Sequence, residues 1–178
     1  SGVIIPRKAI YEIRKLIEDY SHDEQVSISL SDSKIRVKIS DTIITSKLID
    51  GNFPDYEKVI PKDNANIVNL DCLEFSESVD RVSTIFSDKS KSVRLSLSAN
   101  KLSLEANSPD TGSASEEIGI TYDKDDISIG FNSRYLLDVT SQIGSGDLIM
   151  ALKDSGSPAL ISLPDDTESL FVLMPMRV

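Results

Sequence analysis

The sequence predicts an α+β fold in which helices pack on one face of antiparallel sheets. Two observations support this class. One order of elements, an apolar strand, an amphipathic helix and then alternating strands, occurs three times, with the helices beginning near residues 7, 72 and 133. Short polar turns join consecutive alternating strands. Because antiparallel strand runs, rather than single parallel strands, separate the helices, an α/β fold is disfavoured.

Repeat 1 opens with a predicted strand at Val3–Ile5, and Pro6 suits a helix start. A helix is predicted over Arg7–Tyr20. Its inward stripe is expected to be Ile10, Ile13, Ile17 and Tyr20. The strands expected after it are Gln25–Leu30, Lys34–Ile39 and Thr42–Leu48.

Repeat 2 opens with a predicted strand at Asn66–Leu70, and Asp71 is the expected helix N-cap. The inward stripe of the following helix is expected to be Phe75, Val79, Val82 and Phe86. Its predicted strands are Ser92–Ser98, Lys101–Ala106 and roughly Ala114–Thr121.

Repeat 3 opens with a predicted strand at Asp126–Phe131, followed by a helix capped by Asn132 or Ser133. The residues expected to face inward are Leu136, Val139, Thr140 and Ile143. The strands expected at the end are Asp147–Lys153, Pro158–Leu163 and Leu170–Met174. Pro175 cannot donate to a strand ladder, so the last strand should end near it.

The segment between repeats 1 and 2, Ile49–Asp63, contains Gly51, Pro54 and Pro61 and is the expected domain boundary. Three repeats indicate that two pair into a complete domain and one is left unpaired. A lone repeat leaves a sheet edge and apolar surface open. The chain is therefore expected to be a fragment that starts inside a domain.

Composition argues against several classes of function and location. The net charge of -10 argues against a uniformly basic surface for nucleic acid, and the absence of Trp disfavours a base-stacking platform. A single cysteine cannot form an internal disulfide, so a cytoplasmic setting is expected. No run approaches the roughly 20 apolar residues that span a bilayer, so no membrane association is expected.

Candidate catalytic groups are few. His22, the one histidine, lies in a polar turn, and Cys72 is expected to pack as a small apolar residue at a helix start. Ser31–Lys34 and Ser98–Lys101 match the S-x-x-K pattern of some acyl-transfer enzymes, but both lie in equivalent hairpin turns. The acidic Tyr122–Asp126 lacks the glycine and final glutamate of a calcium loop. No metal or cofactor site is expected.

The helix of repeat 1 has one basic face. At 100° per residue its cations fall within about 120°, opposite the isoleucine stripe. These cations are Arg7, Lys8, Arg14 and Lys15. The alternative, a solvated face that also carries Glu12 and Glu18, remains open.

Five stretches in order resemble one family over essentially the whole chain. They are VIIPRKA at Val3–Ala9, TSKLIDGNFPDYEKVIPK at Thr45–Lys62, KSVRLSLSANKL at Lys91–Leu102, IGFNSRYLLDV at Ile129–Val139 and the terminal VLMPMRV. The family is the bacterial DNA sliding clamp, the beta subunit of DNA polymerase III.

The resemblance implies the DNA clamp fold, with residues 1–56 as the second half of a middle domain and 57–178 as a complete C-terminal domain. It implies a non-catalytic processivity factor that encircles duplex DNA as a head-to-tail homodimeric ring. It also implies that the four cations of the repeat 1 helix face the DNA. Short peptides from DNA polymerase III, the clamp loader, other polymerases and repair proteins would bind the ring.

The resemblance also implies a peptide pocket. Its residues would be Pro54, Tyr56, Lys58, Val59, Asn132, Tyr135, Pro158, Val172, Met174, Pro175, Met176 and Arg177. Methionine and aliphatic side chains suit a pocket that accepts varied peptides, because thioether chains repack readily. Lys58 stands where arginine is common in the family, and Pro158 where serine is frequent.

The resemblance places a subunit interface at Thr84 and Ile85, with Glu116 and Glu117 as further members. Without the remaining domains, the fragment is expected to be monomeric and to lose full peptide affinity. Two other classes stay open from the residues: an unrelated α+β protein-interaction module, and a serine acyl-transfer enzyme.

Overall fold

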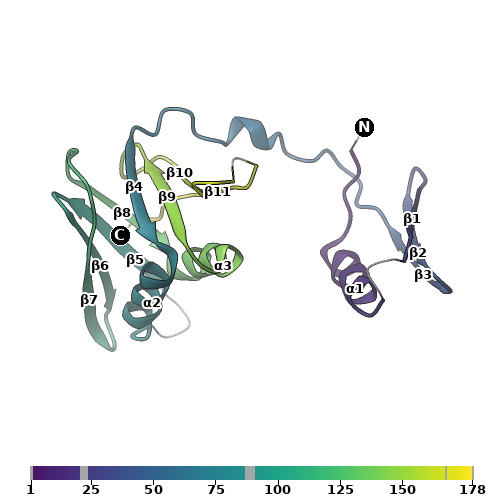
Figure 1. Ribbon diagram of the computed structural model, residues 1–178, viewed down its shortest axis with the longest axis horizontal. Helices are drawn as coiled ribbons and strands as arrows, with labels where there is room; N and C mark the ends of the chain where they lie inside the picture. Colours follow the sequence, from purple (N-terminus) through teal and green to yellow (C-terminus); the bar gives the residue numbers. More distant parts are fainter. Residues whose placement is uncertain (1, 21–23, 87–90, 167, 178) are drawn as a thin grey trace. The chain divides into compact units, whose positions relative to one another are not determined.

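The computed structural model describes residues 2–20, 24–86, 91–166 and 168–177, so the predicted loop residue His22 lies outside it. The chain divides into two compact units, Ser1–Asp55 (unit 1) and Tyr56–Val178 (unit 2). Both combine helix with antiparallel sheet (Figure 1), which confirms the predicted α+β class.

The described part of unit 1 forms one helix, α1 (Arg7–Glu18), and one antiparallel sheet in the order β1-β2-β3. The strands are β1 (Val26–Leu30), β2 (Lys34–Ile39) and β3 (Thr42–Lys47). The alternation of β2 buries Ile35, Val37 and Ile39, and Ala9 of α1 is buried as well. The small core of unit 1 is thus centred on β2.

Two expectations for repeat 1 are wrong. Val3–Ile5 is not a strand; Ile4 forms only an isolated antiparallel bridge with Ile49. Ile10 and Ile17 are not inward, since each is 48% exposed. Both differences fit one feature: the described residues of unit 1 form a single helix and a single three-stranded sheet, which leaves few elements to pair with Val3–Ile5 or to cover Ile10 and Ile17.

Unit 2 begins with the short 3-10 helix η1 (Tyr56–Lys58), and its described residues form two α-helices and two four-stranded antiparallel sheets. The sheet orders are β11-β10-β9-β4 and β7-β6-β5-β8. The helices are α2 (Cys72–Ser83) and α3 (Ser133–Ile143). The strands are β4 (Asn66–Asp71), β5 (Ser92–Ser98), β6 (Lys101–Ser108), β7 (Gly112–Gly119), β8 (Ile127–Asn132), β9 (Asp147–Leu152), β10 (Ala159–Ser162) and β11 (Leu170–Leu173).

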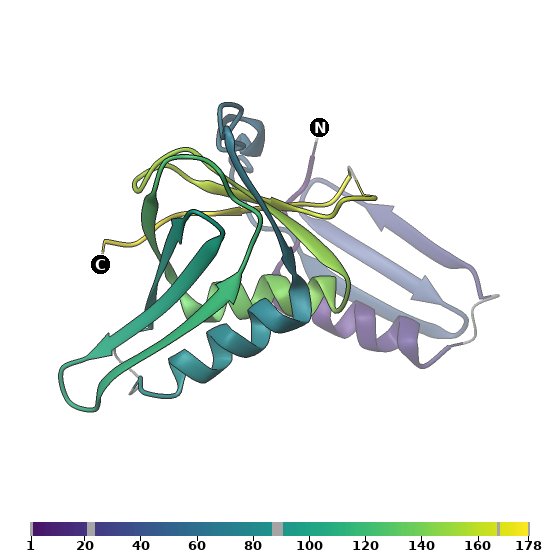
Figure 2. The ribbon, with the colours of Figure 1, turned by 60° about the vertical axis from the view of Figure 1, so that its left-hand side comes forward.

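Repeats 2 and 3 complete each other in unit 2. The leading strand of each repeat pairs with the first strand after the helix of the other, so β4 pairs with β9 and β8 with β5. The helices α2 and α3 lie side by side on one side of the sheets (Figures 1 and 2). One continuous core joins both helices to both sheets.

The predicted helix starts in unit 2 are confirmed. The Asp71 carboxylate accepts a hydrogen bond from the Glu74 N–H at 2.8 Å, and Asn132 Oδ1 accepts one from the Arg134 N–H at 3.0 Å. Phe86 is not part of the α2 stripe, because the helix ends at Ser83; it packs partly buried against the core. Within the described residues, no helix has the length and apolarity needed to cross a membrane.

Candidate functional site

A cavity of about 500 Å³ lies in unit 2 between α3 and β11. Its lining residues are Tyr135, Asp138, Val139, Leu170, Phe171, Val172, Leu173 and Met174. Three residues expected in the peptide pocket, Tyr135, Val172 and Met174, therefore lie together. Tyr135 is 58% exposed and Met174 63% exposed, so their side chains are available to a ligand.

The secondary structure explains this grouping. β11 is the end strand of its sheet and pairs with β10, with Val172 opposite Leu160. Leu173 is buried and anchors the strand, whereas Met174 follows the strand and is exposed. Asp138 and Val139 lie one helical turn after Tyr135 and so share its face of α3. Their spacing from Tyr135 could have predicted them as pocket residues.

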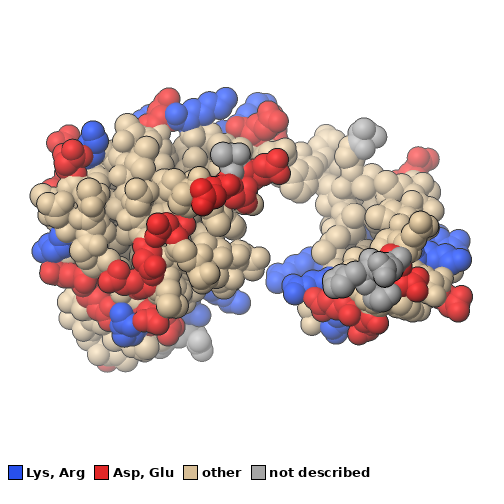
Figure 3. All heavy atoms as spheres, viewed as in Figure 1, with Lys and Arg blue, Asp and Glu red and all other residues tan. Residues whose placement is uncertain are grey.

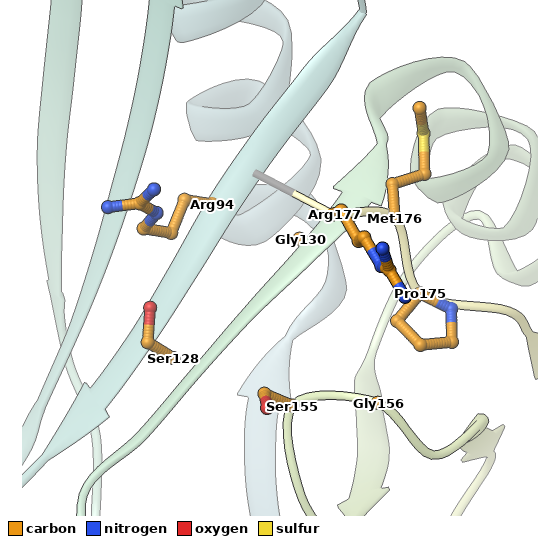
Figure 4. Close-up of a pocket in the computed structure, with 8 residues that line it drawn as sticks. All are labelled: Arg94, Ser128, Gly130, Ser155, Gly156, Pro175, Met176 and Arg177. Atoms are coloured by element: carbon orange, nitrogen blue, oxygen red, sulfur yellow. The ribbon is translucent and has the colours of Figure 1, made fainter.

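The residues after Met174 line part of a second cavity, of about 600 Å³ (Figure 4). It is lined by Arg94, Ser128, Gly130, Ser155, Gly156, Pro175, Met176 and Arg177. The Met176 N–H donates to the Gly130 carbonyl of β8 at 2.8 Å, which fixes this end of the chain beside the sheet. The C-terminal segment thus contributes to two different cavities on either side of the Met174–Pro175 bond.

Asn132 and Pro158 line neither of these cavities. Asn132 uses its side-chain oxygen to cap α3. The carbonyl of Pro158 accepts a hydrogen bond from Asn64 Nδ2 at 2.9 Å, and the same amide donates to the Ala151 carbonyl at 2.9 Å. Asn64, which sequence reasoning missed, therefore ties the end of the linker to the β9–β10 hairpin.

The linker residues expected in the pocket line neither cavity either. Pro54 is an exposed residue near the end of unit 1. Tyr56 is the first residue of η1 and Val59 directly follows that helix; they are 60% and 55% exposed, and Lys58 is exposed too. Tyr56 and Val59 offer apolar surface that unit 2 leaves uncovered.

The four predicted cations of α1 are all exposed. Arg14 Nε lies 2.7 Å from Glu18 Oε1, and this hydrogen bond raises the pKa of Arg14. Lys15 Nζ lies 4.6 Å from the centre of the Tyr11 ring. Figure 3 shows both signs of charge on each unit, with acidic side chains in a band across the face of unit 2 in view. Lys8 and Lys15 lie two turns apart on one face of the helix.

The predicted interface residues gather at β7, the end strand of its sheet. The Arg81 guanidinium binds Glu116 in a bidentate pair, at 2.6 Å from Nε and 2.9 Å from the second nitrogen, and this contact lowers the pKa of Glu116. Thr84 and Ile85 follow α2 directly, and the Ile85 carbonyl accepts a bond from Thr111. Glu117 points to the other face of β7, where it pairs with Lys101 at 2.9 Å.

The serine acyl-transfer alternative finds no support in the S-x-x-K turns. Ser31 Oγ accepts a hydrogen bond from the backbone N–H of Lys34 at 3.1 Å, so it serves its own turn. The Lys101 amine donates to Glu117 Oε1 at 2.9 Å, so it is directed to that carboxylate. Cys72 is buried, and burial raises its thiol pKa, as expected of a packing residue. Among the described residues, no three or more Asp, Glu, His or Cys side chains lie close enough together to hold a metal ion.

Comparison with known proteins agrees with this geometry. A family model of the DNA polymerase III beta subunit, C-terminal domain, matches residues 57–177, and one of its central domain matches residues 1–55. The beta sliding clamp of Caulobacter vibrioides is 45% identical over 177 residues, which are 99% of this chain and 47% of that protein. The Escherichia coli clamp is 34% identical over 177 residues, 99% of this chain and 48% of that protein.

Solved structures agree in fold. A Bartonella birtlesii sliding clamp bound to griselimycin has a TM-score of 0.95 and 46% identity, covering 100% of this chain and 48% of that one. A Caulobacter crescentus sliding clamp has a TM-score of 0.93 and 43% identity, covering 100% of this chain and 47% of that one. The chain thus spans about half the length of these relatives. It belongs to the beta sliding clamp family, the beta subunits of DNA polymerase III.

Proposed function

We propose that this chain is the C-terminal half of a processivity clamp, with residues 1–56 as the second half of the middle domain and 57–178 as the complete C-terminal domain. The observation that carries the proposal is the pair of family models, matched in order to residues 1–55 and 57–177 of one chain. The complete protein encircles duplex DNA in the cytoplasm, without catalysing a reaction. As a head-to-tail homodimeric ring it tethers DNA polymerase III, the clamp loader, other polymerases and repair proteins.

The α1 cations face the DNA in this proposal. A sliding ring needs weak, sequence-independent attraction to phosphates, because tight contacts would oppose movement. Arg7, Lys8, Arg14 and Lys15 supply it from an otherwise acidic chain. Lys8 and Lys15 contribute most, since Arg14 is already paired with Glu18.

Charge reversal of this face tests the DNA contact. In the full-length parent, Lys8→Glu with Lys15→Glu should weaken low-salt binding of duplex DNA and reduce its salt dependence, because two phosphate contacts are lost. The control makes the same charge change on exposed β2 and β3, with Lys38→Glu and Lys47→Glu. Equal losses in the two double variants would refute a specific role for α1.

The cavity between α3 and β11 forms part of a peptide pocket in this proposal. It provides an apolar floor in Val172 and Phe171 and two exposed, adaptable walls in Tyr135 and Met174. The family resemblance adds Pro54, Tyr56, Lys58, Val59, Asn132, Pro158, Pro175, Met176 and Arg177. A related clamp binds griselimycin, so a clamp of this fold does hold a ligand.

Calorimetry with a peptide bearing Leu and Phe tests the pocket. In the full-length parent, Val172→Asp should lower the peptide affinity by about 100-fold, because a carboxylate would be desolvated against apolar groups. Ile67→Asp is the control, since Ile67 is 55% exposed on β4 and lines neither cavity. Unchanged affinity in Val172→Asp would favour an unrelated interaction module.

The ring interface is proposed at the β7 edge, through Thr84, Ile85, Glu116 and Glu117. An end strand with unpaired backbone groups is a ready surface for a second subunit. In the full-length parent, Ile85→Lys should convert the dimeric ring to a monomer, as measured by light scattering. A stable ring in that variant would contradict this assignment. The 178-residue chain should not close a ring through this edge.

A further inference from the structure

The second cavity of unit 2 gathers positive charge without negative charge. Of the eight described residues that line it, two are arginines, Arg94 and Arg177, and none is acidic. The whole chain carries 29 acidic and 19 basic residues, so a wall of this charge runs against its composition. Because the lining charges have one sign, the cavity favours an anionic ligand.

The fold brings three segments of unit 2 together around this cavity (Figure 4). Arg94 of β5 lies opposite Gly130 of β8 in the antiparallel register. Because Gly130 has no side chain, it leaves the surface of the sheet open beside Arg94. The Met176 N–H donates to the Gly130 carbonyl at 2.8 Å, which holds the C-terminal segment against the same strand. The turn between β9 and β10 closes the cavity with Ser155.

The guanidinium of Arg94 has no carboxylate partner among the described residues. Glu105 of β6 lies opposite Arg94 in the register, yet no ion pair joins the two side chains. Arg81, by contrast, binds Glu116 at 2.6 Å. Arg94 is half-buried, and removing a charge from water without a partner costs free energy. An anion in the cavity would supply that partner.

Two serine hydroxyls add hydrogen-bond donors to the wall of the cavity. Ser128 accepts a hydrogen bond from the Ser96 hydroxyl at 3.3 Å, which leaves its own hydrogen for a ligand. Ser155 supplies the second hydroxyl. Asp154 precedes it but does not line the cavity, since its carboxylate accepts the Gly156 N–H at 2.9 Å within its own turn. Guanidinium and hydroxyl donors together suit a carboxylate ligand.

This cationic cavity adjoins the cavity between α3 and β11. Met174 lines the α3–β11 cavity, and the next residue, Pro175, lines the cationic one. Consecutive Cα atoms lie about 3.8 Å apart, so a peptide of a few extended residues can reach from one cavity to the other. The continuity of the two cavities favours a single peptide as the ligand of both.

We propose that the cationic cavity is an anion subsite of the peptide pocket, where Arg94 and Arg177 bind an Asp or Glu side chain that flanks the apolar anchors of a partner peptide. The inference rests on the proposed function and adds the charge of the partner segment. Arg94 can hold a carboxylate through two parallel N–H donors. Duplex DNA is disfavoured as the ligand, because two cations in a chain of net charge -10 give little attraction to a row of phosphates.

Calorimetry at low salt tests the subsite in the full-length parent. Three peptides share one core that bears Leu and Phe: the first has two Asp before the core, the second has two Asp after it, and the third has Asn in both places. We expect one flank alone to raise the affinity, by about tenfold, because the cationic cavity lies to one side of the apolar one. Equal gains from both flanks, or no gain from either, overturn the proposal.

Substitution of Arg94 assigns the gain to this cavity. Arg94→Ala should abolish the preference for the acidic peptide and leave the affinity for the Asn peptide unchanged. Arg94→Lys should retain part of the preference, because the charge remains while the paired donors are lost. Arg134→Ala is the control, since Arg134 is exposed in unit 2 and lines neither cavity. A preference that survives Arg94→Ala, or that falls equally in Arg134→Ala, overturns the proposal.

The subsite and the peptide pocket fail in different ways. If Val172→Asp leaves binding of the Asn peptide unchanged, the pocket is wrong and the subsite falls with it. If Val172→Asp weakens the Asn peptide but the wild type shows no preference for acid, only the subsite is wrong. Circular dichroism of each variant confirms the folded protein. An equal loss of acidic and Asn peptides in folded Arg94→Ala would also refute the subsite, since Arg94 would then support the pocket and not bind the acid.

Discussion

Units 1 and 2 share one order of elements and differ in whether a second repeat is present. In unit 2, two repeats exchange leading strands and bury Leu95 and Met150 to 0% and 1% exposure. In unit 1, the lone repeat leaves Ile28 at 63% exposure. An alternating pattern thus decides which side chains share a face of a sheet, and a separate element decides whether that face is buried.

The largest contrast should appear in local stability. Among the described residues of unit 1, the buried apolar ones are Ala9, Ile35, Val37 and Ile39, whereas the core of unit 2 spans two helices and two sheets. We therefore expect unit 1 amides to exchange by opening events that leave unit 2 closed. Hydrogen exchange resolved by residue measures this. Equal protection of β2 and β5 would contradict the contrast.

The next largest difference should appear in the free energy of unfolding when apolar side chains on the first strand after the helix are truncated in each unit. Leu95→Ala should lower the free energy of unfolding of unit 2 by about 2–5 kcal/mol, because it leaves a cavity in a closed core. Ile28→Ala should cost no more than about 0.5 kcal/mol, because its side chain is exposed. Urea unfolding measures both free energies. A similar cost at the two positions would show that unit 1 covers β1 by itself.

Much of unit 2 could be predicted from the sequence, and less of unit 1. Periodicity located α2, and the Asp71 and Asn132 caps marked the helix starts, because these signals are local. The same signals failed for Val3–Ile5 and Ile10, because strand pairing and burial of a helix face depend on elements distant in sequence. The family resemblance named Tyr135, Val172 and Met174, which line the α3–β11 cavity, whereas Asn64 was missed because its two carbonyl partners are distant in sequence.

Substitutions at the helix N-caps should change the stability of the two units by a smaller amount. Asp71→Ala removes the side-chain cap of α2 and should cost unit 2 about 1 kcal/mol. Pro6 precedes α1 without a side-chain hydrogen bond, so Pro6→Ala removes no cap. Thermal unfolding of the two variants measures the difference. A larger loss in Pro6→Ala would mean that rigidity at Pro6, and not capping, sets the start of α1.

The smallest effect should come from the Arg81–Glu116 pair, which joins α2 to the end strand β7, whereas Arg14 and Glu18 pair within α1. The pair lowers the pKa of Glu116, so its stabilisation is present above the unfolded carboxyl pKa and is lost as pH falls through the folded value. Arg81→Gln should therefore destabilise unit 2 at neutral pH and match the wild type in acid. Lys101→Gln, at the more exposed pair with Glu117, is the control. A deficit in Arg81→Gln that persisted unchanged at low pH would assign the effect to packing of the arginine stem instead of to its charge.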